Sequence, residues 1–323
     1  MKHFLIALIV LCNSMVTSAT EVWPSGDKTI EIIVPFPAGG GGDKWGRVVN
    51  EIFRSQGWKS VVVNKPGADT VIGANHVASA RPDGHTLFVG GTSFITNLAF
   101  QKRVSGIEYT ETSFAPIISL GAGTAVLAVN KDLPINNYQE FKQYVKANPD
   151  KFNLGFWHSH TSNIFYEWAQ KEGLPRPNIV IYKGSAPQIV DLLGGHVPFA
   201  FDVFANLAQH YQSGKVKIVA VLDSQGMEII KKTNAQANVV SLAHIHNSLD
   251  MPIWYGLYAP ANTPPDTITK INQVINRALK DPKYSQDLSS LHVANYGGTI
   301  LEQQQIQTRF LNNMRRLAAA AEK

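Results

Sequence analysis

The sequence predicts an α/β protein with two lobes. Its 323 residues exceed what one ordinary hydrophobic core holds, so two domains are expected. Strand-like apolar runs alternate with helix-like apolar periodicity along the chain, which is typical of α/β folds. The alternation starts again near Asn137, so the second half repeats the scheme of the first.

The first elements are a strand, a glycine-rich turn and a helix. Residues 29–36 have the apolar pattern of a buried strand, and four glycines follow within VPFPAGGGGD, residues 34–43. A second strand over residues 59–64 completes a strand–helix–strand unit and predicts a parallel sheet. The helix between them is indicated by apolar side chains at helical spacing: Trp45, Val48, Val49, Ile52 and Phe53.

A turn, a short helix and a turn are expected over residues 64–84, and a strand over residues 85–94. The second half opens with a helix whose capping box is Asn137 and Glu140. Its inward positions would be Tyr138, Phe141, Tyr144 and Val145.

Residues 152–170 predict a strand, a loop and a helix, and residues 178–196 repeat this order. In the second unit Ser185 is the expected N-cap, with Pro187 in the first turn, and Gly194-Gly195 ends the helix. The apolar face of the first helix would hold Ile164, Phe165, Trp168 and Ala169.

Strands are also expected over residues 197–204 and 216–223, and a long amphipathic helix begins near Thr263. No Pro/Gly/Ser-rich linker separates the halves, so strands are expected to cross between the lobes. The best candidates are residues 115–130 and 251–260.

The N-terminal residues have the features of a secretory signal peptide. Lys2 and His3 precede an apolar run and then small residues, so cleavage is expected after residue 19. Cys12 is the only cysteine, and bulky Leu11 before it disfavours a lipoprotein. The secreted chain would then lack cysteine, which excludes disulfides and thiolate zinc sites and favours the bacterial periplasm.

The charge pattern disfavours a nucleic-acid-binding protein. The chain is 44% hydrophobic and 16% charged, as in folded globular proteins, and its formal net charge is +5. The basic residues are scattered rather than clustered. A mild positive field suits an anionic small ligand.

The four glycines fit neither nucleotide motif. No Gly-Lys-Ser/Thr follows them, and Asp43 stands where the dinucleotide fingerprint needs glycine. A helix start after a strand can still bind a carboxylate through its unpaired amides. The alternative is a tight turn in which Asp43 caps its own helix. Two further helix starts, residues 160–162 and 183–185, suggest a cleft with anion-binding groups on both walls.

Five segments together resemble the extracytoplasmic solute receptors of tripartite tricarboxylate transporters, the Bug or TctC-like family. They are VPFPAGGGGD, VVNKPGADTVIGA, ARPDGHTLFVG, YKGSAPQIVDLLGGHV and WYGLYAPANTPPD, in this order along the chain. The resemblance implies a type II, Venus-flytrap periplasmic binding protein with a hinge of crossing strands. It also implies the capture of a small carboxylate for a membrane permease. We expect the carboxylate to be a di- or tricarboxylate or an aromatic acid, and the receptor to be a monomer. The expected first lobe is residues 20–124 plus 250–323, and the second is residues 125–249.

The resemblance implies ligand contacts from the loops 38–43 and 158–163. Gly42 stands where the family usually has Thr or Ser, and WHSHTSN, residues 157–163, is bulkier than the usual loop. These departures bear on the ligand rather than on the fold. The full set of expected ligand-binding residues is Phe36, Ala38, Gly39, Gly40, Gly41, Gly42, Asp43, Thr92, Ser93, Trp157, His158, Ser159, His160, Thr161, Ser162, Asn163, Lys183, Gly184, Ser185 and Asp202.

Several of these residues have a structural alternative. Asp202 could cap the following helix instead of binding an ammonium, a hydroxyl or water. Thr92 and Ser93 could cap a turn, and Lys183 could lie on the surface instead of neutralising a second carboxylate. Aromatic Phe36 and Trp157 could belong to the core instead of stacking on a ligand.

Two other functions are alternatives to carboxylate capture: metal binding and catalysis. The pairs His158/His160 and His244/His246 could each bind a metal, but no acidic cluster accompanies either pair. A catalytic role lacks a G-x-S-x-G elbow and closely spaced carboxylates. We therefore expect no metal, no cofactor and no catalytic residue.

Overall fold

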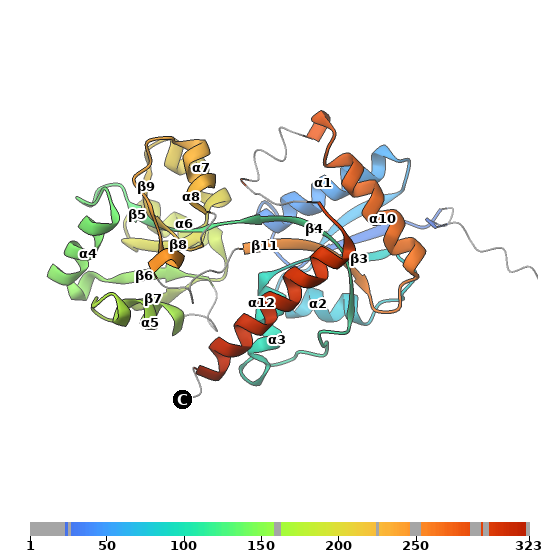
Figure 1. The fold of residues 1–323 in the computed structure, drawn as a ribbon, viewed down its shortest axis with the longest axis horizontal. Helices are drawn as coiled ribbons and strands as arrows, with labels where there is room; N and C mark the ends of the chain where they lie inside the picture. The colour runs from blue at the N-terminus through green and yellow to red at the C-terminus, as the bar shows by residue number, and fades with distance from the viewer. Residues whose placement is uncertain are drawn as a thin grey trace, which may run out of the picture.

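The computed structural model describes residues 23–24, 27–157, 163–223, 226–245, 253–284, 292 and 297–320. These residues form two lobes side by side, each a β-sheet with helices on both faces (Figure 1). The predicted α/β, two-lobed fold class is confirmed. The predicted signal peptide lies outside the described residues.

The sheet of the first lobe is mixed. Three adjacent strands at one edge of the sheet, β2, β1 and β3, are parallel to one another. Strand β11 (Ile253–Pro260) runs antiparallel to both of its neighbours, β3 and β4. The parallel pairing predicted from the first strand–helix–strand unit is confirmed, and β11 adds an antiparallel strand because it arrives from the other lobe and enters from the opposite end. The strand order is β2 (Ser60–Asn64), β1 (Ile30–Val34), β3 (Thr86–Gly91), β11 (Ile253–Pro260) and β4 (Phe114–Gly123).

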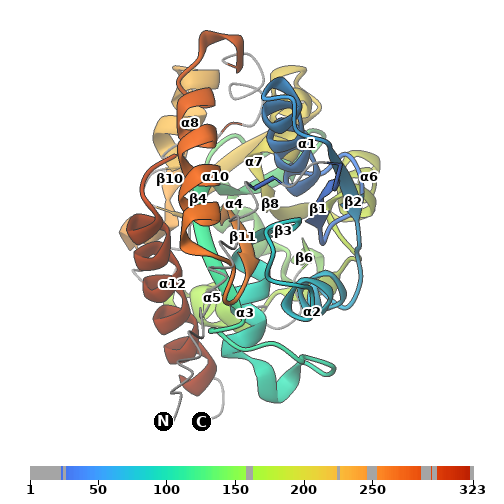
Figure 2. The same cartoon turned by 90° about the vertical axis from the view of Figure 1, so that its right-hand side faces the viewer.

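Helices cover both faces of this sheet (Figure 2). One face carries α1 (Gly41–Ser55) and α10 (Pro265–Ala278). The other carries α2 (Val71–Ala78), α3 (Thr92–Ala99) and α12 (Ile300–Ala320). Short 3-10 turns follow α3 and α10, at Gln101–Arg103 (η1) and Pro282–Tyr284 (η5). No described helix is long and apolar enough to span a bilayer.

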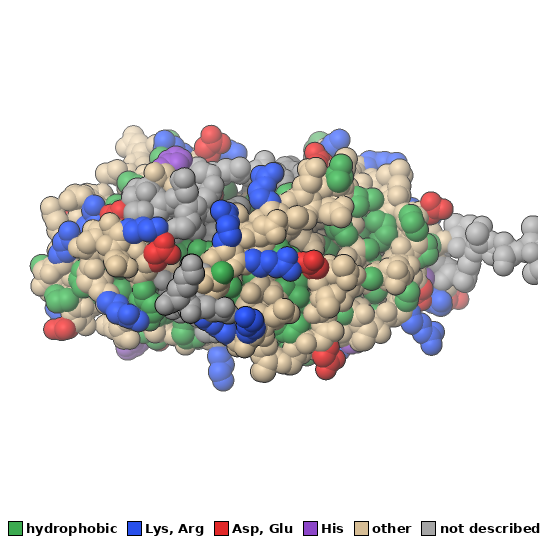
Figure 3. Space-filling model, turned by 60° about the horizontal axis from the view of Figure 1, so that its bottom comes forward, with side chains coloured by type: hydrophobic (Ala, Val, Ile, Leu, Met, Phe, Trp, Pro, Cys, Tyr) green, Lys and Arg blue, Asp and Glu red, His purple; other side chains and the backbone are tan. Residues whose placement is uncertain are grey.

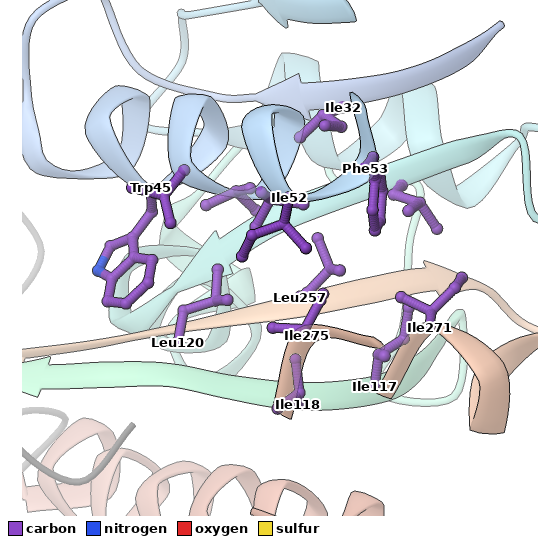
Figure 4. Packing of buried hydrophobic residues seen from close by; sticks show 14 of the residues in the cluster. Ile32, Trp45, Ile52, Phe53, Ile117, Ile118, Leu120, Leu257, Ile271 and Ile275 are labelled. Atoms are coloured by element: carbon purple, nitrogen blue, oxygen red, sulfur yellow. The ribbon is translucent and has the colours of Figure 1, made fainter. Parts of the chain in front are cut away.

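The core of the first lobe confirms the predicted inward positions of α1. Trp45, Ile52 and Phe53 pack against isoleucines of α10 and apolar residues of β4 and β11 (Figure 4). The helical spacing predicts this face because side chains three and four residues apart lie together on one helix face.

The second lobe has a six-stranded mixed sheet. Strand β5 is antiparallel to both β8 and β9, because it too crosses from the other lobe. The order is β10 (Val240–Ser241), β9 (Val216–Val221), β5 (Ala125–Asn130), β8 (Phe199–Val203), β6 (Asn153–Phe156) and β7 (Asn178–Ile181).

Two groups of helices cover this second sheet. One face carries α4 (Tyr138–Ala147) and α5 (Asn163–Lys171), with the 3-10 turn η2 (Pro149–Lys151) between them. The other carries α6 (Ser185–Gly194), α7 (Phe204–Gln212) and α8 (Gly226–Thr233). A single turn, α9 (Leu242–Ile245), follows β10.

The predicted helix boundaries of this lobe are partly confirmed. The Asn137 side chain accepts the Glu140 amide at 2.9 Å, which is one half of the predicted capping box. The Glu140 carboxylate accepts the Asn136 amide at 2.7 Å, one residue before the N-cap, instead of the Asn137 amide. Gly195 ends α6 in the left-handed region, with φ 76°.

Three connections join the lobes. Strand β4 runs into β5 through Thr124, whose carbonyl accepts the Phe204 amide at 2.8 Å. The chain returns to the first lobe as β11. The third connection is α12, since Leu317 packs against core residues of both lobes.

Candidate functional site

The glycine loop leaves the start of α1 open. Gly40 is the N-cap of this 15-residue helix, and no side chain caps it. Among the described residues, the amides of Gly40, Gly41 and Gly42 have no hydrogen-bond acceptor. Unpaired amides and the helix dipole make this end favourable for an anion.

Asp43 fixes the shape of the loop. Its Oδ2 accepts the Gly39 amide and the Arg47 Nε, each at 2.9 Å, and its Oδ1 accepts the Asn64 Nδ2 at 3.0 Å. Burial works to raise its pKa, but these hydrogen bonds and the Arg47 charge hold the pKa below its ordinary value. From its position in the first turn of α1, Asp43 therefore fixes the loop through its hydrogen bond to the Gly39 amide, and Arg47 balances its negative charge.

Tyr255 of β11 lies against this helix start and is not among the expected ligand-binding residues. A Cβ at Gly41 would lie 2.9 Å from the Tyr255 hydroxyl, so the residue here must be small. A Cβ at Gly91 would lie 3.2 Å from the same ring, and Phe36 meets that ring edge-on at 6.2 Å between centroids. Phe36 is half-buried against the first-lobe core, and Ala38 and Gly39 are exposed. The available signal was the position of Tyr255 in a predicted crossing strand.

Thr92 and Ser93 open α3 beside Tyr255. Both are buried, and the N-cap is Gly91 without a side-chain bond, so the alternative that they cap a turn is wrong. Their place after β3 puts them at the same strand ends as the glycine loop.

Asp202 of β8 is a buried carboxylate of the second lobe. It is 1% exposed, and its Oδ1 accepts three donors: the Ser185 hydroxyl at 2.9 Å, the Val203 amide at 2.6 Å and the Asn206 Nδ2 at 2.9 Å. Its Oδ2 is buried and has no hydrogen-bond partner among the described residues. Burial raises the pKa of Asp202 to about 6, against the opposing effect of these hydrogen bonds.

Two predicted caps in this region are wrong. Asp202 lies within β8 and does not cap α7, whose N-cap Val203 makes no side-chain bond. Ser185 is the first residue of α6, after the N-cap Gly184 at φ 115°, and its hydroxyl is drawn to Asp202 instead. The buried carboxylate is the stronger acceptor, so the hydroxyl turns toward it.

The remaining predicted residues are only partly described. Lys183 is exposed and makes no ion pair with a described residue. Trp157 is half-buried and packs against Phe156 with centroids 5.6 Å apart. Asn163 opens α5, but its side chain is not described. His158, Ser159, His160, Thr161, Ser162 and His246 lie outside the described residues.

The start of α1 with Tyr255, on the first lobe, faces Asp202 and the start of α7, on the second lobe. Burial and then the negative charge of Asp202 raise the pKa of the Tyr255 hydroxyl well above its ordinary value, so the hydroxyl stays protonated. His292 meets Phe204, the first residue of α7, with ring centroids 5.0 Å apart. Burial and then the charge of Lys44, in the first turn of α1, lower the pKa of His292. The start of α1 therefore lies near the start of α7.

Asp202→Asn is expected to change how stability depends on pH. An ordinary aspartate pKa lies near 3.9, so the folded protein holds this proton more tightly than the unfolded chain. The stability from Asp202 is then complete below about pH 4 and is lost as pH rises through about 6, a cost of roughly 3 kcal/mol. Urea denaturation between about pH 4.5 and 7.5 should show this fall in the wild type and not in Asp202→Asn.

The matched control is Asp191→Asn in α6. Asp191 is half-buried and accepts the Tyr182 hydroxyl at 2.8 Å. This variant should keep the wild-type pH dependence because Asp202 is still present. A pH-independent difference between wild type and Asp202→Asn would contradict the expectation.

The described residues contain no group of three or more His, Cys, Asp or Glu that could hold a metal ion. His244 is exposed at the end of the second lobe. On the face shown in Figure 3, basic side chains are spread over both lobes, as the sequence pattern predicts.

Comparisons with known proteins agree with this architecture. Residues 46–320 match the model of the TctC family, described as tripartite tricarboxylate transporter family receptors. BugT of Bordetella pertussis is 30% identical over 266 residues, which cover 81% of this chain and 79% of BugT.

Solved structures share the fold. The periplasmic binding protein BugD superposes with a TM-score of 0.77 at 26% identity, covering 92% of this chain and 98% of BugD. MatC of Rhodopseudomonas palustris superposes with a TM-score of 0.75 at 23% identity, covering 90% of this chain and 98% of MatC. The chain belongs to the family of tripartite tricarboxylate transporter receptors.

Proposed function

We propose that this protein is a periplasmic receptor that captures a small carboxylate between its lobes and delivers it, unchanged, to a membrane permease of the tripartite tricarboxylate type. The observation that carries the proposal is the open start of α1. Three consecutive amides have no acceptor in the described part of the chain, and the carboxylate in the first turn, Asp43, is paired with Arg47. The place is thus favourable for an anion that comes from outside the chain.

Capture would work by lobe closure. The first lobe, residues 20–124 plus 250–323, would offer Gly39–Gly42, Thr92 and Ser93, with Phe36 beside them. The second, residues 125–249, would offer Trp157, loop 158–163, Gly184–Ser185 and Asp202. A ligand that contacts both walls binds the closed state better than the open one, and this difference drives closure. Lys183, exposed near this wall, would add positive charge.

Proteins of the same fold hold such ligands. MatC was solved with bound malate, and Rpa4515 of R. palustris, 22% identical with a TM-score of 0.78, was solved with adipate. Both ligands are dicarboxylates, which supports a di- or tricarboxylate as the ligand here, and an aromatic acid is the other class that we propose. The signal peptide expected at residues 1–19 supports a periplasmic location, and we propose that the receptor acts as a monomer.

A thermal-shift screen tests the proposal. Aliphatic dicarboxylates, tricarboxylates and aromatic acids should raise the unfolding midpoint, because a ligand that binds only the folded state stabilises it by mass action. The matched controls are the corresponding neutral amides, such as succinamide beside succinate, which keep the shape and lose the charge. Equal stabilisation by acid and amide, or turnover of the stabilising acid by the pure protein, would overturn the proposal.

A further inference from the structure

Asp202 has one satisfied and one unsatisfied oxygen. Three donors of the second lobe converge on Oδ1, whereas Oδ2 is buried without a partner among the described residues. A buried carboxylate oxygen without a donor is costly, and native proteins keep few of them. The three donors also fix the orientation of the carboxylate, so Oδ2 is a rigid acceptor that lacks only its donor.

Tyr255 supplies the complementary group from the first lobe. Its hydroxyl lies against Gly41 at the start of α1, is protonated, and makes no hydrogen bond with any described residue. The ring is held on two further sides, by Phe36 and by the glycine backbone at Gly91. This hydroxyl is therefore a fixed group at the edge of the proposed anion site.

The strand pairing brings these two residues to the same crossing. Tyr255 pairs with Gly121 of β4, and Asp202 pairs with Val126 of β5, which continues β4 into the second lobe. The charge of Asp202 acts on the Tyr255 hydroxyl, and the contact between His292 and Phe204 places the start of α7 beside the first lobe. If a ligand carboxylate binds at the start of α1, the carbon atom next to that carboxylate would lie near Tyr255 and Asp202.

We propose that Asp202 and Tyr255 form a subsite that binds a hydroxyl or ammonium substituent of the ligand, so that the receptor selects hydroxy- or amino-carboxylates over the unsubstituted acid. This inference rests on the proposed carboxylate capture. Oδ2 is buried in the present lobe arrangement, so the inference requires that the ligand reach it when the lobes part.

The chemistry of the pair makes the selection specific. A ligand hydroxyl can donate to Asp202 Oδ2 and also accept from the Tyr255 hydroxyl, whereas an ammonium can only donate. An unsubstituted acid leaves Oδ2 without a donor, and sites that hydrogen-bond a substituent reject analogues that lack it. A carboxylate placed here instead would be repelled by Asp202.

Matched acids of one carbon skeleton test the inference. The protein is unfolded and refolded to remove any co-purified ligand, and calorimetry then measures three sets of acids. The sets are succinate, malate and aspartate; glutarate, 2-hydroxyglutarate and glutamate; and phenylacetate, mandelate and phenylglycine. In the set that binds best, a substituted acid should bind at least about tenfold more tightly than its parent.

Two variants locate the selection. Asp202→Asn should reduce the preference for the substituted acid over its parent to about threefold or less. Tyr255→Phe should weaken the hydroxy acid about fivefold or more, because it removes the donor to the ligand hydroxyl. The controls are Asp191→Asn and Tyr258→Phe. In the wild type the Tyr258 hydroxyl accepts the Gln303 Nε2 at 2.6 Å in the first-lobe core, away from the proposed subsite. Both controls should keep the wild-type preference.

The outcomes separate the two proposals. A parent acid that binds as tightly as its substituted relatives in the best-binding set overturns the subsite and leaves carboxylate capture standing. A preference that survives Asp202→Asn also overturns the subsite. If no acid of any set or of the wider screen binds, carboxylate capture fails and the subsite fails with it.

Discussion

Gly41→Val is expected to weaken carboxylate binding by at least about tenfold, or roughly 1.4 kcal/mol, while the protein stays folded. A Cβ at this position would lie 2.9 Å from the Tyr255 hydroxyl and 3.4 Å from the ring carbon that bears it. Tyr255 must then shift, and the valine branches lie over the amides that would hold the anion. Calorimetry with the acid that best stabilises the wild type measures the loss.

The control is Gly194→Val at the outer end of α6. Gly194 is exposed, and a Cβ there would approach only the exposed His196 ring, at 3.1 Å. This variant should bind like the wild type. Unchanged affinity in a folded Gly41→Val protein would show that the glycine loop is only a turn.

Trp168→Ala is expected to lower the free energy of unfolding by about 3–5 kcal/mol. Trp168 is 1% exposed and stands at the centre of the second-lobe aromatic core, stacked on Phe141 and edge-on to Phe201. Its Nε1 donates to the Tyr138 hydroxyl at 3.0 Å, so removal also leaves a buried hydroxyl without this partner. Urea denaturation followed by far-UV circular dichroism measures the change.

Trp168→Phe separates the two contributions. It keeps much of the ring packing and loses the Nε1 hydrogen bond, so a smaller loss of about 1–2 kcal/mol is expected. A loss below about 1 kcal/mol in Trp168→Ala would contradict the central role of this side chain in the core.

Local patterns predicted the elements that depend on near neighbours. The apolar spacing around Trp45 and Phe53 defines one face of α1, and Asn137 and Glu140 bond within a single turn. Such features need only the periodicity of a helix and the chemistry of its ends, and both are visible in a short stretch of sequence.

Features that depend on distant partners were not predicted. The hydroxyl of Ser185 suits a helix cap, but it donates instead to the carboxylate of Asp202, seventeen residues away in sequence. Tyr255 becomes part of the candidate site only because β11 pairs with β3 and β4 and thereby reaches Gly41. The reversed direction of β11 and β5 has the same origin, since it follows from which lobe each strand leaves.

Helix α12 restricts how the two lobes can move. Two strand connections alone would allow the second lobe to bend toward the first and also to twist about the axis of the strands. Leu317 adds an attachment point away from those strands, because it packs into the cores of both lobes. A contact that lies away from the line of the two strands opposes torsion more than bending, so we expect the cleft to open and shut mainly by a bend.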